Sequence, residues 1–428
     1  MRIVVVGGGV LGLCCALELS EAGADVVVLD RDAEPGGASM ANAGWVVPVL
    51  SAPLAVPGIV ASVAKQALRG RSPVAVGPRL TPDLLGWGAK FVRNANPKTH
   101  RDGLRALLAL GARSAQQFGE LAGRGVEFEM HRRGLVIAAR TAAGLHEAFE
   151  LAEAAERAGY TGAYDIHSGG SLRRLEPALA DDVAGGVHAR DEIHVRPESV
   201  VAGLHAALES RGVEVRRRVR VLGVERDGSR WSAVTSAGPE RADRVVVAAG
   251  AWTGEILRGL GVAVPLQPGK GYSVTATGTG PAPRHAMKLL EANVACTPFA
   301  GGLRISGMFE LAPGSAAVRE RALRKVRREA RKYLPGWRPA EPGTRLAGFR
   351  PSTPDSLPII GPVPGADGVF AASGHGMLGL TLAPATAQAL AALITTGSAP
   401  VDLAPFEVGR FGRRTGAAQV AARFEQGN

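Results

Sequence analysis

The chain has 428 residues, which is enough for a large core and for two domains or two closely linked lobes. Its 57 glycines and low aromatic content are typical of a soluble α/β enzyme. The sequence contains no run of about eighteen apolar residues, so we expect no membrane-spanning helix. The three cysteines show no disulfide or ligand spacing, so we predict neither a disulfide nor a metal site.

Fifty basic and 39 acidic residues give a net charge of +11. Nucleic-acid binding is not expected, because no known module and no basic patch interleaved with aromatics is present. Much of the excess charge lies in residues 318–334, whose pattern predicts an amphipathic helix covering a sheet. The same helix could dock on an acidic partner or an anionic membrane. We therefore expect a cytoplasmic protein, with peripheral attachment to the inner face of the membrane as the alternative.

The first thirty residues predict a strand at 2–6, a helix at 11–22 and a second strand at 25–29, which together form a βαβ unit. A signal peptide is the competing interpretation. Glycines interrupt its apolar stretch and Glu18 and Glu21 follow it, so we expect the folded protein to start at its own first strand.

The rest of the chain contains predicted helices and strands separated by an irregular stretch. Residues 51–100 are irregular in pattern, and short strands fill 212–250 and 263–310. A closing strand, loop and helix spans 368–397. The other expected elements are helices at 101–124, 141–158 and 199–211, the last with Ser199 as its cap, and a strand, turn and strand at 127–139.

Strand–helix units of the nucleotide-binding type thus occur at both ends and in the middle of the chain. We predict an α/β fold with a discontinuous Rossmann-type domain and a second domain built mostly on an antiparallel sheet. The expected boundaries are 1–50, 150–250 and 345–428 for the nucleotide-binding domain, and 51–149 and 251–344 for the second domain.

The first turn carries the dinucleotide fingerprint GxGxxG, directly after a strand and opening a helix. Gly7 permits the tight turn, Gly9 lets a pyrophosphate approach the backbone, and Gly12 allows close packing of helix on strand. Asp30 ends the next strand, where a carboxylate can accept hydrogen bonds from a ribose diol. These residues predict a dinucleotide site but do not separate NAD from FAD.

Five later segments, in this order, make the chain resemble the D-amino-acid oxidase superfamily, and within it the bacterial D-amino-acid dehydrogenases. They read PGGASMANAGWVVP, VVVAAGAWT, PGKGYSVT, GFRPSTPDSLPIIG and SGHGMLGLTLAP. The resemblance implies FAD as the cofactor and makes the second domain the substrate domain. Branches with covalent FAD have a cysteine shortly before the TPD element; residues 348–355 contain none, so the FAD is expected to be non-covalent.

The resemblance also implies which residues contact the cofactor. The closing glycine-rich loop opens a helix, whose positive end would lie where the reduced flavin becomes anionic; a plain glycine loop before a packing helix is the alternative. The implied contacts are Gly7, Gly9, Val10, Leu11 and Gly12 at the pyrophosphate, Asp30 and Arg31 at the ribose, Ser39 at the phosphates, Asn42, Gly44, Trp45 and Val46 along the flavin, Val221 at the adenine, Ala249 and Gly250 beside the cofactor, and Gly374, His375, Gly376, Met377, Leu378, Gly379, Leu380 and Thr381 at the flavin's pyrimidine end.

Three residues are candidates for the substrate pocket. In relatives the Arg of GxRP clamps the substrate carboxylate, so Arg350 is the leading candidate, with an ordinary salt bridge as the alternative. Tyr272 could contact the substrate or cover the flavin, or be a core residue. His375 could contact flavin or substrate, or be structural. Met377 stands where some oxidases of the superfamily have an Arg, which favours the dehydrogenase branch.

The implied reaction is oxidative deamination of a D-amino acid to a 2-oxo acid and ammonia, by hydride transfer to the flavin N5. Electrons would pass to a quinone or another carrier, such as an electron-transfer protein. The alternatives are a flavin amine oxidase that uses oxygen on sarcosine, glycine or D-hydroxyproline, an NAD-dependent dehydrogenase, and a flavin-binding assembly factor without turnover.

Overall fold

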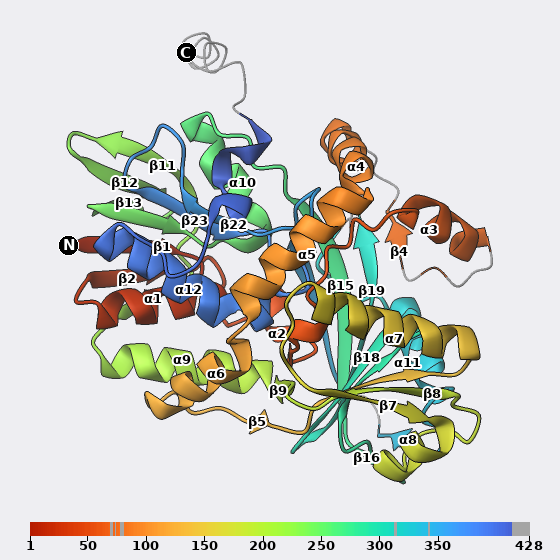
Figure 1. The fold of residues 1–428 in the computed structure, drawn as a ribbon. Coiled ribbons are helices and arrows are strands. Elements are labelled where there is room, and N and C mark those ends of the chain that lie inside the picture. The colour runs from red at the N-terminus through yellow and green to blue at the C-terminus, as the bar shows by residue number, and fades with distance from the viewer. Residues whose placement is uncertain (69–71, 73, 78–80, 312–314, 341–342, 413–428) are drawn as a thin grey trace.

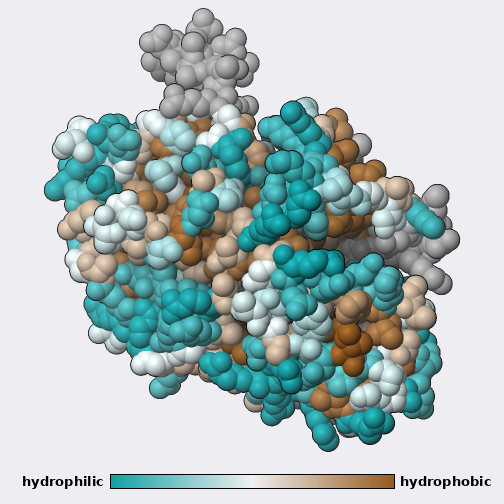
Figure 2. All heavy atoms as spheres, viewed as in Figure 1, coloured by the Kyte–Doolittle hydropathy of each residue, from teal (hydrophilic) through white to brown (hydrophobic). Residues whose placement is uncertain are grey.

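The computed structural model describes residues 1–68, 72, 74–77, 81–311, 315–340 and 343–412. Two main sheets, each covered on both faces, lie side by side and meet along a seam (Figure 1). Hydrophilic residues cover most of the face seen in Figure 2, and apolar residues are exposed there only in smaller groups.

The first sheet is the predicted Rossmann-type sheet. Five of its six strands are parallel, and the last is antiparallel to its neighbour. Its strands come from widely separated parts of the chain, as the discontinuous domain predicts. In sheet order they are β10 (Glu214–Arg216), β2 (Asp25–Leu29), β1 (Arg2–Val6), β14 (Arg244–Val247), β23 (Val369–Ser373) and β22 (Ile359–Pro362).

The apolar run in β1 is buried on both faces. Ile3 and Val5 face a cluster with the helices, whereas Val4 and Val6 face a cluster with the small sheet of β11 (Val221–Asp227), β12 (Arg230–Thr235) and β13 (Gly238–Ala242). This two-sided burial is why the strand reads as a continuous apolar run rather than an alternating one.

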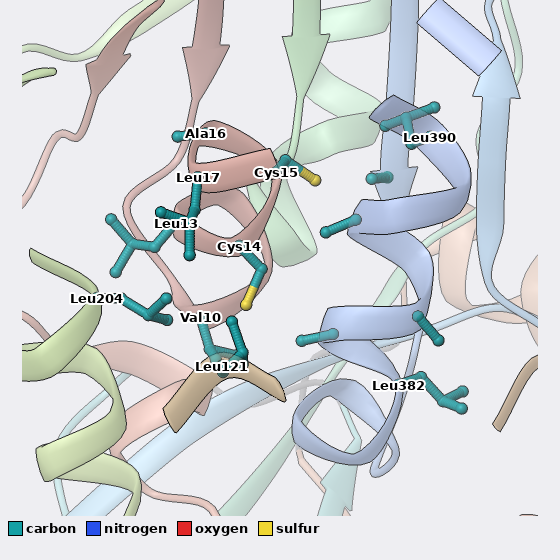
Figure 3. Close-up of a cluster of buried hydrophobic side chains, with 14 of the residues drawn as sticks. Val10, Leu13, Cys14, Cys15, Ala16, Leu17, Leu121, Leu204, Leu382 and Leu390 are labelled. Atoms are coloured by element: carbon teal, nitrogen blue, oxygen red, sulfur yellow. The ribbon is translucent and has the colours of Figure 1, made fainter. Parts of the chain in front are cut away.

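Helices cover the other face of this sheet. Figure 3 shows α1 packed through Val10, Leu13, Cys14 and Leu17 against its neighbours, with Leu382 and Leu390 on the last helix. The cysteines are buried and free, as expected. The helices here are α1 (Val10–Glu21), α5 (Pro97–Gly111), α6 (Ser114–Gly123), α9 (Pro197–Ser210) and α12 (Gly379–Thr396).

Among the described residues, α12 is the one helix long and apolar enough to cross a membrane. Its window has a mean hydropathy of 1.2 and is 67% buried inside the protein. Because α12 packs against α1 in the core (Figure 3), its apolar length is accounted for by the fold.

The second sheet is mostly antiparallel, as predicted. Its order is β21 (Thr344–Ser352), β15 (Gln267–Ala276), β19 (Gly302–Leu311), β18 (Val294–Phe299), β17 (Ala286–Leu289), β6 (Leu135–Ala139), β8 (Gly185–Ala189) and β7 (Tyr164–Ser168), with β4 (Val74–Val76) also on β19. Three of these strands, β7, β8 and β21, come from segments that the sequence assigned to the nucleotide-binding domain. The predicted boundaries near 150 and 345 therefore differ from the sheet that the structure builds.

Helices also cover the second sheet on both faces. The basic segment forms α11 (Glu320–Arg331), whose Leu323, Val326 and Ala330 pack on the sheet, so the predicted amphipathic helix is confirmed. The opposite face is covered by α7 (Ala142–Arg157). The remaining elements are α2 (Gly37–Met40), α3 (Ile59–Leu68), α4 (Pro82–Asn94), α8 (Gly169–Leu175), α10 (Thr253–Ile256), β3 (Trp45–Val46), β5 (Met130–His131), β9 (Ile193–Val195), β16 (Gly278–Thr279), β20 (Arg338–Pro339) and short 3-10 turns.

Candidate active site

The glycine-rich turn has the shape that the fingerprint predicts. Gly7 has a φ of +112°, and a Cβ there would lie 2.5 Å from the Ala248 carbonyl oxygen. A Cβ on Gly12 would lie 1.9 Å from the Gly7 carbonyl oxygen. Any side chain at either position would push β1, β14 and α1 apart, so the close packing requires glycine.

The amino end of α1 is prepared for an anion. The Leu13 amide is bonded to the Gly9 carbonyl at 3.0 Å, and amides earlier in a helix have no acceptor within it. The Ser39 hydroxyl accepts from the Val10 amide at 3.0 Å, and a Cβ on Gly9 would lie 3.1 Å from that hydroxyl. The predicted phosphate residues are thus brought together beside a helix N-terminus, where phosphate is favoured.

Asp30 stands at the end of β2, beside this turn. Its carboxylate accepts from the Gly8 and Asp32 amides, and its carbonyl accepts from the Val219 amide at 2.8 Å. The last contact joins the end of β2 to the segment that leads into β11, which begins at Val221, the predicted adenine neighbour. These bonds fix the carboxylate where a ribose is expected.

The predicted ribose neighbour Arg31 is held by stacking. Its guanidinium lies 3.4 Å from the centre of the Trp252 ring, and the same ring meets Phe349 edge-on. Trp252 follows Gly250, whose carbonyl accepts from the Ser373 hydroxyl at 2.8 Å. The predicted cofactor neighbours at 249–250 therefore lie between the first turn and the last strand.

The amino end of α12, which follows the closing loop, meets the amino-terminal half of the site at Trp45. The Thr381 hydroxyl donates to the Trp45 carbonyl at 3.0 Å, and the Trp45 indole donates to the Thr297 hydroxyl at 2.9 Å. Two regions more than 300 residues apart in sequence are joined by the first of these bonds. The predicted flavin-contacting segments at 42–46 and 374–381 thus share one location.

Arg304 supports this location and was not predicted. It is buried, and its guanidinium donates to the Met40 and Asn42 carbonyls and pairs with Glu198. Nothing in the sequence near Arg304 marks it, because its partners become neighbours only in the fold. Its effect is to hold the backbone leading to Gly44, whose amide donates to the Asn42 side chain at 2.8 Å.

The closing loop is tied to the strand of Arg350. Gly374 and Gly376 have φ values of +78° and +54°, which glycine tolerates and other residues rarely adopt. The Gly376 amide donates to the Pro351 carbonyl at 2.9 Å, and a Cβ on Gly374 would lie 2.8 Å from Thr353. Within the loop, Met377 is exposed, and Leu378 leads into α12, whose amino end comprises Gly379, Leu380 and Thr381.

Arg350 has no acidic partner among the described residues. Its guanidinium donates to the Met308 carbonyl at 2.9 Å and lies 5.8 Å from the centre of the Phe309 ring. Burial lowers the pKa of Arg350 from its usual value to about 10. At neutral pH the side chain is therefore charged and half-buried, and no described residue supplies a counter-ion, which suits binding of a carboxylate.

The sheet is shaped around this guanidinium. A Cβ on Gly271 would lie 2.3 Å from an Arg350 nitrogen, so the glycine leaves the space that the side chain occupies. Opposite Gly271, β19 bulges at Met308, which has a φ of +67°. The bulge turns the Met308 carbonyl toward Arg350, a use of local strain that is common at functional sites.

The other two pocket candidates lie elsewhere. Tyr272 follows Gly271 and points to the opposite face, where it packs in the cluster under α11 and its hydroxyl donates to Glu310 at 2.5 Å. His375 is buried, and its Nε2 lies 3.0 Å from the Thr386 hydroxyl within α12. Burial lowers the pKa of His375 to about 3, so the ring is neutral at working pH. The structure favours the core interpretation for both.

The family model described as "DAO: FAD dependent oxidoreductase" matches residues 2–393. The chain belongs to this DAO family. It is an FAD-dependent oxidoreductase, and the glycine turn, the open helix end and the fixed Asp30 fit the dinucleotide part of FAD.

Relatives across the DAO family cover nearly the whole chain. A D-amino acid dehydrogenase from Methylobacterium nodulans is 34% identical, over 94% of this chain and 96% of its own, and one from Xanthobacter autotrophicus is 33% identical, over 96% and 99%. Among solved structures, glycine oxidase from Geobacillus kaustophilus matches with a TM-score of 0.75 at 22% identity, covering 96% of this chain and 99% of its own. The last likeness is one of fold.

Proposed function

We propose that this protein oxidises a D-amino acid to a 2-oxo acid and ammonia and passes the electrons to a quinone or another carrier rather than to oxygen. The observation that carries the proposal is Arg350, a half-buried guanidinium beside the closing loop that has no acidic partner among the described residues. The relatives named D-amino acid dehydrogenase support a D-amino acid as substrate and a dehydrogenase rather than an oxidase.

The chain's own residues bind and orient the substrate in this proposal. Arg350 holds the α-carboxylate through two parallel hydrogen bonds, with the Met308 carbonyl fixing the plane of the guanidinium. FAD, when bound, accepts the hydrogen of the α-carbon together with two electrons. Water then converts the imino acid to the 2-oxo acid and ammonia.

A side-chain base is not part of this scheme. The Tyr272 hydroxyl donates a hydrogen bond to Glu310 on the far face of the sheet, and the His375 ring is enclosed in the core. Burial is the main cause, and the hydrogen bond to Glu310 the second, of a raised pKa of Tyr272, which keeps its hydroxyl protonated. The substrate therefore reacts as the neutral amine, which needs no base, and turnover should rise with pH as the amine loses its proton.

Anaerobic mixing of the FAD-loaded protein with single amino acids tests the proposal. We expect D-amino acids to bleach the flavin absorbance and their L-enantiomers to leave it unchanged. A quinone analogue should restore the colour faster than air, with little peroxide formed.

The alternatives give different results. Bleaching by sarcosine or glycine but by no D-amino acid, with stoichiometric peroxide in air, would replace the proposal with an amine oxidase. No bleaching by any amino or N-methyl amino acid would indicate a flavin-binding protein without this activity.

A further inference from the structure

A group of metal-ligating side chains lies at the end of the second sheet farthest from Arg350. The strands there are β8 and the edge strand β7, which pair antiparallel. Asp165 on β7 stands directly opposite His188 on β8, and His167 follows Asp165 by two residues. Residues two apart on a strand share a face, so all three side chains lie on one face of the sheet.

The three side chains converge on a point. One ligand atom from each of Asp165, His167 and His188 lies within 4.8 Å of the other two. Ligand atoms around a zinc ion at about 2.0–2.2 Å are at most about 4 Å apart, so small side-chain movements bring these three into range.

Each imidazole already has one nitrogen fixed by a protein oxygen. The Nδ1 of His167 lies 2.8 Å from the Ser171 hydroxyl, while its Nε2 is buried without a hydrogen-bond partner. The Nε2 of His188 lies 3.2 Å from the Arg133 carbonyl, which leaves its second nitrogen for a ligand. Metal-binding histidines are typically held in this way, with one nitrogen on a protein oxygen and the other on the ion.

We propose that Asp165, His167 and His188 form a binding site for a divalent transition-metal ion, with Zn²⁺ as its simplest occupant. Two imidazoles and one carboxylate suit zinc and its neighbours, whereas calcium and magnesium prefer sites made of oxygen atoms. Three protein ligands leave a fourth position for water.

Arg190 is the competitor for this site. Its Nε lies 3.3 Å from Oδ2 of Asp165, and both side chains are substantially exposed. The other carboxylate oxygen remains for a metal, and the exposed Arg190 can move away. Its positive charge weakens metal binding, so Arg190→Gln should tighten it severalfold.

The site joins the edge strand β7 to its one neighbour, so its expected effect is on stability rather than on the reaction. Within the described part of the chain, β7 is paired on one side only, and its Ile166 is exposed. A metal bridging β7 and β8 binds the folded chain and not the unfolded one, which raises the melting temperature. Since Arg350 lies on β21 at the opposite end of the sheet, amino-acid oxidation should not depend on the metal.

Calorimetric titration with Zn²⁺ tests the proposal on the FAD-loaded protein after removal of metals with a chelator. We expect one tight equivalent of Zn²⁺ and a higher melting temperature in its presence. His167→Gln and Asp165→Asn should each weaken binding at least about tenfold, since losing a supporting residue alone costs that much. His146→Gln, a change at an exposed histidine on α7, is the matched control and should bind Zn²⁺ like the wild type.

The interpretation does not depend on a single variant. His188 packs against Gly134, so His188→Gln could disturb folding, whereas Asp165 and His167 lie on the edge strand. Absence of saturable Zn²⁺ binding in the wild type would overturn the proposal. Equal affinity in the wild type, His167→Gln and Asp165→Asn would do the same.

Discussion

Replacing Arg350 with Met should make the protein more stable and much less active. Burial lowers the pKa of Arg350 from 12.5 to about 10, and at about 1.4 kcal/mol per unit the charge destabilises the fold by at most about 3 kcal/mol, since the side chain is only half-buried. Both the folded and unfolded forms are charged at pH 7, so the whole cost is present there. Met retains the apolar stem but leaves the Met308 carbonyl without its donor, at about 1 kcal/mol. The net expectation is a gain of at most about 2 kcal/mol.

The activity should change in the opposite direction. Two hydrogen bonds from a guanidinium to a carboxylate contribute about 1.5–3 kcal/mol each, so losing both costs about 4 kcal/mol. This corresponds to a fall of about a thousandfold in kcat/KM. Arg350→Lys keeps the charge but loses the planar fork, and we expect a loss of about 10–100-fold.

Denaturant unfolding and anaerobic reduction kinetics measure the two effects on the same preparations, with rates expressed per bound flavin. Arg345→Gln is the matched control, because Arg345 lies on the same strand and pairs with the half-exposed Glu320. A kcat/KM for Arg350→Met within tenfold of the wild type would refute the role of Arg350 in substrate binding. Lower stability of this variant would refute the account of an uncompensated charge.

Three further changes test other parts of the molecule. Gly12→Ala places a methyl group 1.9 Å from the Gly7 oxygen, so the purified variant should contain little FAD, measured by absorbance against protein. Tyr272→Phe leaves kcat/KM within about threefold but lowers the free energy of unfolding by about 1–2 kcal/mol, because Glu310 loses a buried hydrogen bond. Burial raises the pKa of Glu192 to about 8, so the folded state holds a proton that the unfolded state releases near pH 4.5. Wild-type stability should therefore fall between pH 5 and 9, and Glu192→Gln should remove a few kcal/mol of that fall in denaturant titrations.

The nucleotide-binding half of the site could be predicted because its determinants are local in sequence. Gly7, Gly12 and Asp30 lie within thirty residues, and each performs a backbone task that one residue type does best. The ends of the helices were harder to predict. The helix expected at 101–124 is divided by a turn at 112–113, and the helix expected from Ser199 begins at Pro197, with the Ser199 hydroxyl donating to the Arg196 carbonyl. The prediction of Ser199 as the cap was wrong, since proline at the first helical position set the start instead.

The residues that sequence reasoning missed depend on contacts between distant segments. Arg304 holds carbonyls about 260 positions away, and no pattern near residue 304 indicates this. The same limit applies to the two other pocket candidates, for which a core role was the alternative. Tyr272 and His375 were chosen for their chemistry and their place in family motifs, but strand alternation and helix packing direct both side chains away from the seam. The metal site that we propose could not be predicted from sequence either, because His167 and His188 become neighbours only through the pairing of β7 with β8.

The candidate site lies at the seam between the two sheets, so substrate binding by Arg350 and cofactor binding by the closing loop are expected to depend on each other. Arg350 lies near the end of β21 in the second sheet. Ser352, the last residue of that strand, pairs with His375 of the loop that follows β23 of the first sheet. The Gly376 amide on the Pro351 carbonyl ties the same two segments together. Movement of the carboxylate-binding strand would therefore also move the loop expected at the flavin's pyrimidine end. In such a reaction the protein contributes the orientation of the substrate against the cofactor. A small backbone change where Pro351 and Ser352 meet the closing loop should therefore lower activity far more than stability.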